Sequence, residues 1–290
     1  MKIPILSRLE LSDYLNLIMV ILTLLIEGFL RMFVSVLPNN LMQYLRGDKS
    51  KQKKKRNDIE HFCDVEYHYT TTKDNFVLCV HRLPNPGKPV ILLWHGFMMC
   101  SEVFVCPRSE NSLAKFLHAL GYDVWLGNSR GNKYSKKHLK YATNSQKYWN
   151  FSLDEIVHFD IPAVVDYVLT ATESKTLSYI GFSQGSAQIF AALSNNSCLE
   201  TKINKVIALA AVLKPSPLRQ TIPAALIQSS PAVLFLIFGR QSILRVAAFW
   251  ARALNNKVFA KVLDISMNIL FGWSSEKIDD FDKVIDNLFR

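Results

Sequence analysis

The sequence predicts an α/β fold with a mostly parallel sheet, preceded by an apolar N-terminal segment. Short apolar runs alternate with helical segments after residue 60, a nearly unbroken apolar stretch precedes residue 40, and a G-x-S-x-G motif directly follows one of the runs. Strands that are apolar on both faces are typical of a sheet covered by helices on both sides. With 290 residues, 49% of them hydrophobic, the chain can bury a sizeable core and is not disordered.

The N-terminal apolar segment runs from Tyr14 to Leu37. A helix of this length could cross a hydrocarbon core about 30 Å thick. Glu27 and Arg31 interrupt it at i, i+4 spacing and can pair on one helical face, which favours a tilted helix or one that dips in and returns. We expect residues 1–45 to form a retained membrane anchor. A cleaved signal peptide and a buried helix are the alternatives, and no small-x-small cleavage site closes the apolar run.

Part of the net charge of +10 is concentrated just behind this segment, where residues 49–56 read KSKQKKKR. We expect residues 46–60 to form a basic linker. It is either simply solvated or also touches anionic lipid headgroups, which would hold the downstream domain on the cytosolic side. No stacking aromatic residues interleave with these lysines, so we expect no nucleic-acid partner. Five cysteines without a CxxC pair predict neither a disulfide framework nor a zinc site, which fits a reducing compartment.

Residues 61–215 have the pattern of an enzyme core. Two β-branched or alternating runs separated by Thr-Lys-Asp-Asn indicate a hairpin, and apolar runs bounded by Gly or Pro indicate buried strands. In chain order, we expect hairpin strands at Val65–Thr70 and Phe76–Arg82, a buried strand at Val90–Trp94, a helix at Ser112–Leu120, a strand at Tyr122–Leu126, a helix at Asp154–Leu169, a strand at Leu177–Ile180, a helix at Ser186–Leu193 and a strand at Lys205–Leu213.

The motif that carries chemistry is GFSQG at residues 181–185, between a predicted strand and a predicted helix. G-x-S-x-G in this context is the nucleophile elbow. Gly181 and Gly185 are needed because the sharp turn brings backbones too close for a Cβ on either flank. The turn would lift the Ser183 hydroxyl above the sheet as a nucleophile, and the N–H groups that begin the helix would face developing negative charge. A tight structural turn is the alternative interpretation.

A second element is the pair His95-Gly96, which directly follows the strand at 90–94. In hydrolases of this fold, that position supplies an N–H group to the oxyanion hole. We therefore expect the two oxyanion donors to be the main-chain N–H groups of Phe97 and Gln184. We expect His95 to be an orienting, hydrogen-bonded residue rather than the base. Serine, base and backbone donors suffice for acyl transfer, so we expect no metal and no organic cofactor.

Three motifs in order carry a family resemblance: HGFMMCSEVFVC at 95–106, YDVWLGNSRGNKYS at 122–135 and IGFSQGSA at 180–187. The chain resembles the acid-lipase family of α/β-hydrolases, and within it the fungal membrane-anchored steryl ester hydrolases of lipid droplets. The resemblance covers nearly the whole chain. It implies an α/β-hydrolase fold with a helical cap, Ser183 as nucleophile and Phe97 and Gln184 as oxyanion donors. It also implies that 128–135 is a structural loop at the active-site rim, to which we assign no chemistry.

The resemblance further implies the substrate and the location. Steryl esters are the expected substrate, with triacylglycerols as a second class. The expected partner is a membrane or lipid-droplet surface, with the protein anchored at lipid droplets, at the endoplasmic reticulum or at both, and its catalytic domain facing the cytosol.

The sequence departs from the family at the triad, because all seven histidines precede Ser183. In this fold the chain order is serine, acid, histidine. The acids at Asp264, Asp279, Asp280, Asp282 and Asp286 follow no convincing buried strand, so we interpret them as surface acids. We therefore expect a C-terminally truncated chain that lacks the triad acid, the base and the last strands. Such a chain would be inactive or nearly so, since a positioned base contributes about 10²- to 10⁴-fold.

Residues 216–290 are interpreted as a partial helical cap. The stretch Thr221–Phe238 is apolar and broken at two prolines, and a second apolar run covers Leu263–Trp273. These runs are either core helices of the cap or a lid whose inner face lines an acyl or sterol pocket.

Two other functions stay open. One is a catalytically dead membrane or lipid-droplet protein that keeps the hydrolase fold for binding. The other is a hydrolase of a different ester or amide, because the elbow indicates the reaction class and not the substrate.

Overall fold

The computed structural model describes residues 65–106, 112–211 and 256–271, together with the isolated positions Gly28, Phe29, Met32, Val36, Ile59, Trp250 and Leu254. The chain divides into two compact units, one of Lys55–Pro215 and one that combines Met1–Lys54 with Ser216–Arg290. Apart from isolated positions, the predicted anchor, the basic linker and the stretch Thr221–Phe238 lie outside the described residues. Within the described part, no helix combines the length and the hydropathy that crossing a membrane requires.

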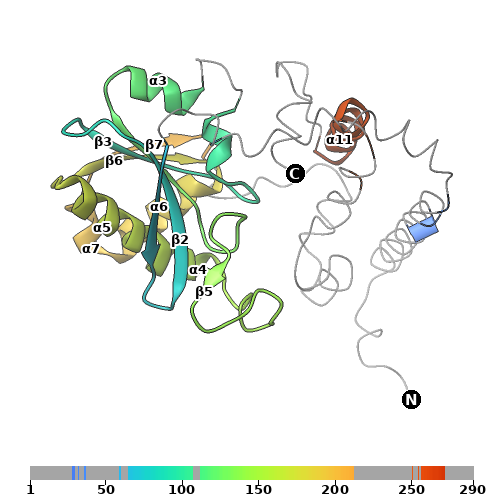
Figure 1. Cartoon of the computed structure of the whole chain (residues 1–290), viewed down its shortest axis with the longest axis horizontal. Coiled ribbons are helices and arrows are strands. Elements are labelled where there is room, and N and C mark those ends of the chain that lie inside the picture. The colour runs from blue at the N-terminus through green and yellow to red at the C-terminus, as the bar shows by residue number, and fades with distance from the viewer. Residues whose placement is uncertain are drawn as a thin grey trace. The chain divides into compact units, whose positions relative to one another are not determined.

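The unit Lys55–Pro215 is built on a seven-stranded sheet (Figure 1). Its strands are β1 (Glu66–Thr71), β2 (Phe76–Leu83), β3 (Val90–Trp94), β4 (Asp123–Gly127), β5 (Lys137–His138), β6 (Leu177–Phe182) and β7 (Ile203–Leu209). The order is β1-β2-β4-β3-β6-β7, with β5 paired to β2. The predicted strands are confirmed to within two residues at each end, except for the last, predicted at Lys205–Leu213, which runs from Ile203 to Leu209. Ala210 follows with a left-handed φ of +47°, which ends the extended backbone.

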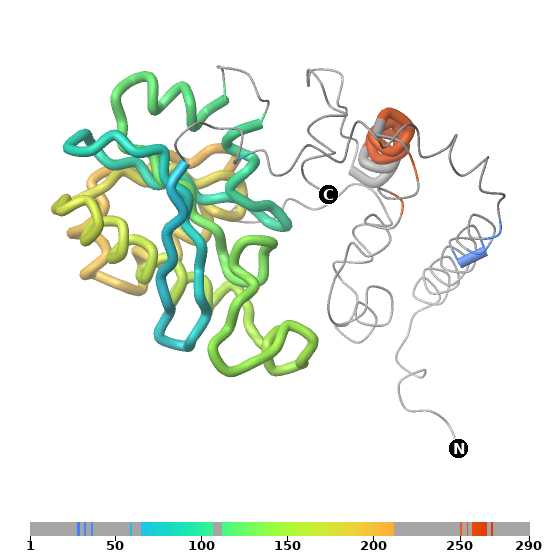
Figure 2. The backbone as a smooth tube through the Cα atoms, viewed as in Figure 1, coloured from blue at the N-terminus to red at the C-terminus, as the bar shows by residue number. Residues whose placement is uncertain are grey.

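Parallel and antiparallel pairs divide the sheet into two parts. Strands β4, β3, β6 and β7 pair in parallel. Strands β1 and β2 form the predicted antiparallel hairpin and run side by side in Figure 2. The sequence did not predict that β2 continues the sheet by pairing antiparallel with β4, nor the short strand β5. Residues at the carboxyl ends of neighbouring parallel strands meet at one edge, so the residues after β3, β4 and β6 lie close together.

Helices cover both faces of the sheet, as the continuous apolar strands predict. They are η3 (Ser101–Phe104), α3 (Leu113–Ala119), α4 (Leu153–Glu155), η4 (Ile156–Asp160), α5 (Ile161–Thr172), α6 (Gln184–Asn195) and α7 (Ser197–Glu200). The alternation along β3 shows the two layers: Leu92 and Trp94 pack with residues of α5, α6 and α7, whereas Ile91 and Leu93 pack with residues of η3 and α3.

The helix predicted at Asp154–Leu169 contains a wider turn. Residues 156–160 (η4) form a π turn, in which the N–H of Ile161 donates to the carbonyl of Ile156, five residues back. Pro162 follows and has no N–H to donate, so the regular i→i−4 ladder cannot continue through this point. Asp160 ends the π turn, and its side chain is fully buried.

In the other unit, the structure describes one helix, α11 (Asn256–Phe271). Phe259 and Ala260 are buried there, and Trp250, Leu254 and Leu263 pack against them. This helix overlaps the second apolar run of the predicted cap.

Candidate active site

Ser183 lies between β6 and α6, in the strand–turn–helix context that the sequence predicts. Its N–H donates to the carbonyl of Leu209 at 2.8 Å, and its carbonyl accepts from the N–H of Ser186 at 3.0 Å. The Ser186 hydroxyl donates to the carbonyl of Gly181 at 2.7 Å. These bonds tie both sides of the turn to the sheet and fix the direction of the serine.

The two flanking glycines are required because the backbone passes too close for a side chain. A Cβ on Gly181 would lie 2.7 Å from the Ser186 nitrogen, and a Cβ on Gly185 would lie 2.6 Å from the Trp94 carbonyl oxygen. Cβ atoms in proteins essentially never come within 3.0 Å of such atoms. The sequence-based reason for these glycines is therefore confirmed by the geometry.

Ser183 has a strained backbone. Its φ is +53° and its ψ is −117°, a conformation that residues with a Cβ rarely adopt. Such strain costs on the order of 1–3 kcal/mol and is concentrated at functional sites. The Ser183 side chain makes no hydrogen bond with any residue that the structure describes, and it does not cap α6. The hydroxyl is therefore free to meet a ligand.

The segment after β3 packs against this turn. A Cβ on Gly96 would lie 3.0 Å from the Ser183 Cβ and 3.2 Å from the Phe182 carbonyl oxygen. The main-chain N–H groups of Phe97 and Gln184 have no partner among the described residues; Phe97 directly follows Gly96, and Gln184 directly follows the serine. Two unpaired N–H groups beside a serine can accept developing negative charge. The Phe97 side chain is exposed.

His95 is buried and hydrogen-bonded through both ring nitrogens. Nδ1 lies 2.8 Å from the carbonyl oxygen of Gly96, and Nε2 lies 3.1 Å from the N–H of Ser129. Burial lowers the pKa of His95 to about 4, so the ring is neutral at neutral pH. Both nitrogens are engaged away from the Ser183 hydroxyl, which agrees with an orienting residue.

Sequence reasoning missed the residues that hold His95, which lie in the loop at 128–135. The Ser129 N–H and hydroxyl and the Asn132 side-chain nitrogen all lie within 3.2 Å of His95 Nε2. A usable signal was present. This loop begins directly after β4, the parallel neighbour of β3, so its first residues must reach the edge where His95 begins.

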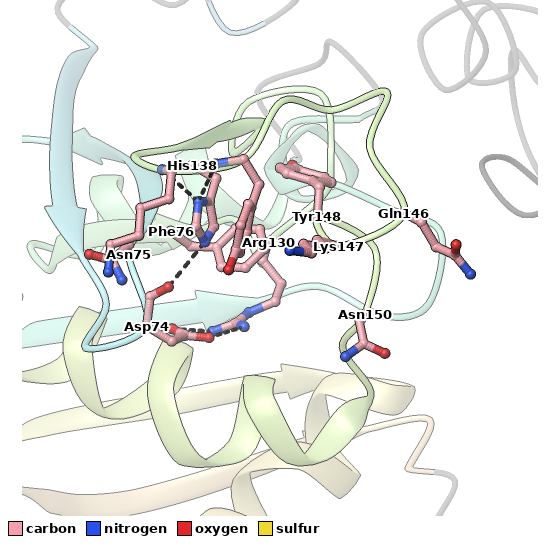
Figure 3. Close-up of a pocket in the computed structure, with 11 residues that line it drawn as sticks. Asp74, Asn75, Phe76, Arg130, His138, Gln146, Lys147, Tyr148 and Asn150 are labelled. Atoms are coloured by element: carbon pink, nitrogen blue, oxygen red, sulfur yellow. Dashed lines mark hydrogen bonds and ion pairs between the residues drawn. The ribbon is translucent and has the colours of Figure 1, made fainter.

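Arg130 anchors that loop through ion pairs with Asp160 and with Asp74, the second of which is drawn in Figure 3. Its main-chain N–H donates to Asp160 at 2.9 Å, and its guanidinium binds the carboxylates of both Asp74 and Asp160. The guanidinium also lies 4.3 Å from the centre of the Phe76 ring. Burial raises the pKa of Asp160 to about 6 against the opposing effect of Arg130. At Asp74, hydrogen bonds from Arg130 and Thr72 outweigh burial and lower the pKa.

A hollow of about 640 Å³ lies on the outer side of this network, lined by Asp74, Arg130, His138, Lys147 and Tyr148 among others (Figure 3). The Tyr148 hydroxyl is buried without a hydrogen-bond partner among the described residues. Arg130 directs its donors to the two carboxylates rather than to the hollow. None of the lining residues belongs to the elbow or to the segment after β3, so the hollow is separate from Ser183.

Three further histidines are hydrogen-bonded to other groups. His81 contacts Ser101, His118 contacts the Pro84 carbonyl and His138 contacts the Asp74 carbonyl. Among the six histidines that the structure describes, none is hydrogen-bonded to the Ser183 hydroxyl.

Residues 89–230 match the family described as "alpha/beta hydrolase fold", and residues 59–108 match "partial alpha/beta-hydrolase lipase region". A Schizosaccharomyces pombe protein named as a probable lipase is 36% identical over 324 residues, which cover 98% of this chain and 69% of that protein. A second such protein is 37% identical over 300 residues, covering 94% and 68%. Human lipase member K is 35% identical over 230 residues, covering 74% of this chain and 56% of its own length.

The similarity to the first two proteins extends over more than two thirds of each of them, and it includes the strand, elbow and helix that carry Ser183. The chain belongs to the acid-lipase family of α/β-hydrolases.

Proposed function

We propose that this chain carries the nucleophile and the oxyanion hole of a serine esterase that hydrolyses lipid esters. Steryl esters are the proposed substrates, with triacylglycerols as a second class. The observation that carries the proposal is the strained Ser183 with a free hydroxyl, placed beside the unpaired N–H groups of Phe97 and Gln184. Relatives named as lipases support the reaction class.

The residues have separate roles in the proposed reaction. The Ser183 hydroxyl attacks the ester carbonyl carbon, and a base takes its proton. The N–H groups of Phe97 and Gln184 stabilise the negative oxygen of the tetrahedral intermediate. Collapse of that intermediate expels the alcohol, which takes up the proton, and leaves the acyl group on Ser183. Water then attacks the acyl-enzyme, releases the fatty acid and restores the hydroxyl.

We infer that these 290 residues do not contain the base. All seven histidines precede Ser183, and none of the six described ones is hydrogen-bonded to its hydroxyl. Without a base the serine is a weak nucleophile. These 290 residues alone are therefore expected to be inactive, or nearly so, on esters.

An added base provides the test. The rate of release of fatty acid from an emulsified steryl ester, from a triacylglycerol and from a short-chain soluble ester is measured with and without free imidazole. Ser183→Ala serves as the control that subtracts uncatalysed hydrolysis. We expect a Ser183-dependent rate only with imidazole, and a higher one on the long-chain esters.

Three outcomes would contradict parts of the proposal. Fast Ser183-dependent turnover without imidazole would show that the base is present in the chain. A preference for the short soluble ester would exclude the steryl ester assignment. No Ser183-dependent turnover on any ester would favour the second candidate function, a catalytically dead membrane or lipid-droplet protein.

We also propose that the chain is held at a membrane or lipid-droplet surface, with the hydrolase unit on the cytosolic side. The apolar segment Tyr14–Leu37 and the basic run at 49–56 support this. The test is cell fractionation of the whole chain and of a variant without residues 1–45. We expect the deletion to move the protein from the membrane or droplet fraction to the supernatant, and an unchanged distribution would exclude the anchor.

A further inference from the structure

The state of the His95 ring is fixed by its neighbours. The Ser129 N–H lies 3.1 Å from Nε2 and can only donate. The Asn132 amide also directs its nitrogen at Nε2, at 3.2 Å, because its oxygen already accepts from the main-chain N–H groups of Tyr134 and Ser135. Nε2 must therefore be the acceptor. The proton of the neutral ring then sits on Nδ1 and is donated to the carbonyl oxygen of Gly96.

That carbonyl belongs to the same peptide unit as the N–H of Phe97. A trans peptide is planar, and its C=O and N–H point in opposite directions. When the His95 ring holds the Gly96 oxygen, it also sets the direction of the Phe97 N–H. Gly96 itself lies close to the nucleophile, because a Cβ on it would lie 3.0 Å from the Ser183 Cβ. The hydrogen bond from His95 therefore orients the proposed oxyanion donor.

The donors that act on His95 are themselves held by Arg130. Its main-chain N–H bonds to one oxygen of Asp160, and its guanidinium bonds to the other. Both side chains are fully buried. The loop is also closed internally by the Gly131 N–H, which donates to the Ser135 carbonyl at 3.0 Å. Ser129 therefore cannot shift without breaking a buried ion pair.

We propose that the turn 129–132, anchored by Arg130 to Asp160, is the positioning element of the oxyanion hole. It keeps the proton of His95 on Nδ1, and the ring in turn aims the Phe97 N–H at the reacting oxygen. Asn132 and Arg130 are positioning residues, because both act through His95. This inference rests on the proposed function, since it concerns the oxyanion hole of the same site.

The first test is Asn132→Asp. The new carboxylate keeps an oxygen for the N–H groups of Tyr134 and Ser135, but presents an acceptor to Nε2 in place of a donor. We expect the ring proton to move from Nδ1 to Nε2, which breaks the bond to the Gly96 carbonyl and which the ¹⁵N chemical shifts of the two ring nitrogens report. Asn204→Asp is the matched control, because Asn204 is exposed and uses its oxygen to accept from Ser178.

Turnover is measured on the same variants with imidazole as the added base. Losing one oxyanion donor lowers kcat by about 10²- to 10³-fold, so we expect Asn132→Asp to lower kcat by about 10²-fold with little change in KM. Arg130→Lys is the second variant. It keeps the charge but loses the pair of hydrogen bonds that the Arg130 Nε and Nη2 atoms donate to Asp160. We expect it to give a mixture of ring states and a smaller fall in kcat. A purely structural role would change stability without moving the ring signals or the kcat of the folded protein.

Two results would overturn the proposal: ring signals of His95 that stay unchanged in Asn132→Asp, or a changed ring state with an unchanged kcat. If the wild-type chain shows no Ser183-dependent turnover with imidazole, the proposed function fails, and the ring signals alone decide whether the turn sets the state of His95. The spectra do not depend on catalysis, so the two failures are distinguishable.

Discussion

Gly185 meets the main chain of Trp94 without space for a side chain: a Cβ at Gly185 would lie 2.6 Å from the Trp94 carbonyl oxygen. The first turn of α6 and the end of β3 are therefore in direct backbone contact. A side-chain bond reinforces it, since the Trp94 indole N–H donates to the Gln188 side-chain oxygen at 2.8 Å, with both groups buried. This contact brings the segment that carries Phe97 to the segment that carries Ser183.

Gly185→Ala should destabilise the protein although it lies in a helix. Glycine to alanine in a helix normally stabilises by about 0.5–1 kcal/mol. Here the new Cβ would meet two carbonyl oxygens, and overpacking of this kind costs about 1–3 kcal/mol or more. Urea unfolding of the whole chain shows whether Gly185→Ala raises or lowers the free energy of unfolding. An unchanged free energy of unfolding in Gly185→Ala would show that the end of β3 and the first turn of α6 can move apart.

Ser183→Gly should make the protein more stable and abolish its ester hydrolysis in the presence of imidazole. The φ of +53° is strained for serine, and glycine adopts positive φ without a steric penalty. We expect the free energy of unfolding to rise by about 1 kcal/mol, measured by urea unfolding. Ser183→Ala also removes the hydroxyl but keeps the Cβ, so it should show no such gain. Equal stability of the two variants would mean that the backbone strain is relieved elsewhere.

Arg130→Met should cost far more stability than the loss of an exposed ion pair. It leaves Asp160 buried without its partner, and breaking a buried pair on one side costs about 3–5 kcal/mol. Adding Asp160→Asn should recover part of the loss, because the remaining buried group is neutral. Lys202→Met is the comparison: Lys202 binds Asp166 at 2.7 Å with both side chains at least a third exposed. Such a pair contributes about 0–1 kcal/mol. If Arg130→Met and Lys202→Met lower the free energy of unfolding by similar amounts, the ion pair of Arg130 with Asp160 does not stabilise the fold more than an exposed pair does.

The elements with a strong local signal could be predicted from the sequence. Val90–Trp94 matches β3 residue for residue, because five apolar residues between turn signals fit only a strand buried on both faces. The elbow was predictable for a related reason: two glycines around Ser183 encode a backbone crossing that a Cβ would block. In both cases the information lies within a few residues.

Contacts between distant residues could not be predicted in the same way. Arg130 and Asp160 are 30 positions apart, and Asp74 is 56 positions from Arg130. Nothing in the local sequence distinguishes these charges from solvated surface charges. The π turn before Pro162 ends at Asp160, and the sequence predicted a regular helix there. The bonds from Ser129 and Asn132 to His95 depend on the parallel pairing of β3 with β4, which only the sheet order reveals.

The pH dependence of stability should be set by two buried histidines and opposed by one buried acid. Burial lowers the pKa of both His81 and His95 to about 4. Between pH 6.5 and 4 the unfolded chain takes up a proton at each ring and the folded chain does not, so acid lowers the free energy of unfolding by up to about 1.4 kcal/mol per pH unit for each histidine.

Asp160 acts in the opposite direction. Burial raises its pKa to about 6, so between pH 4 and 6 the folded state holds a proton that the unfolded state has lost, and acid stabilises through this group.

With two histidines against one carboxyl, the net uptake on unfolding is one proton, and stability should fall by about 1.4 kcal/mol per pH unit as the pH drops from 6 to 5. Urea unfolding at several pH values measures this slope. His81→Gln removes one titrating ring while leaving polar atoms to face Ser101 and Asn128, so it should bring the slope close to zero. An unchanged slope in this variant would mean that His81 already titrates in the folded state near its ordinary pKa, and that water reaches the space between β2 and η3.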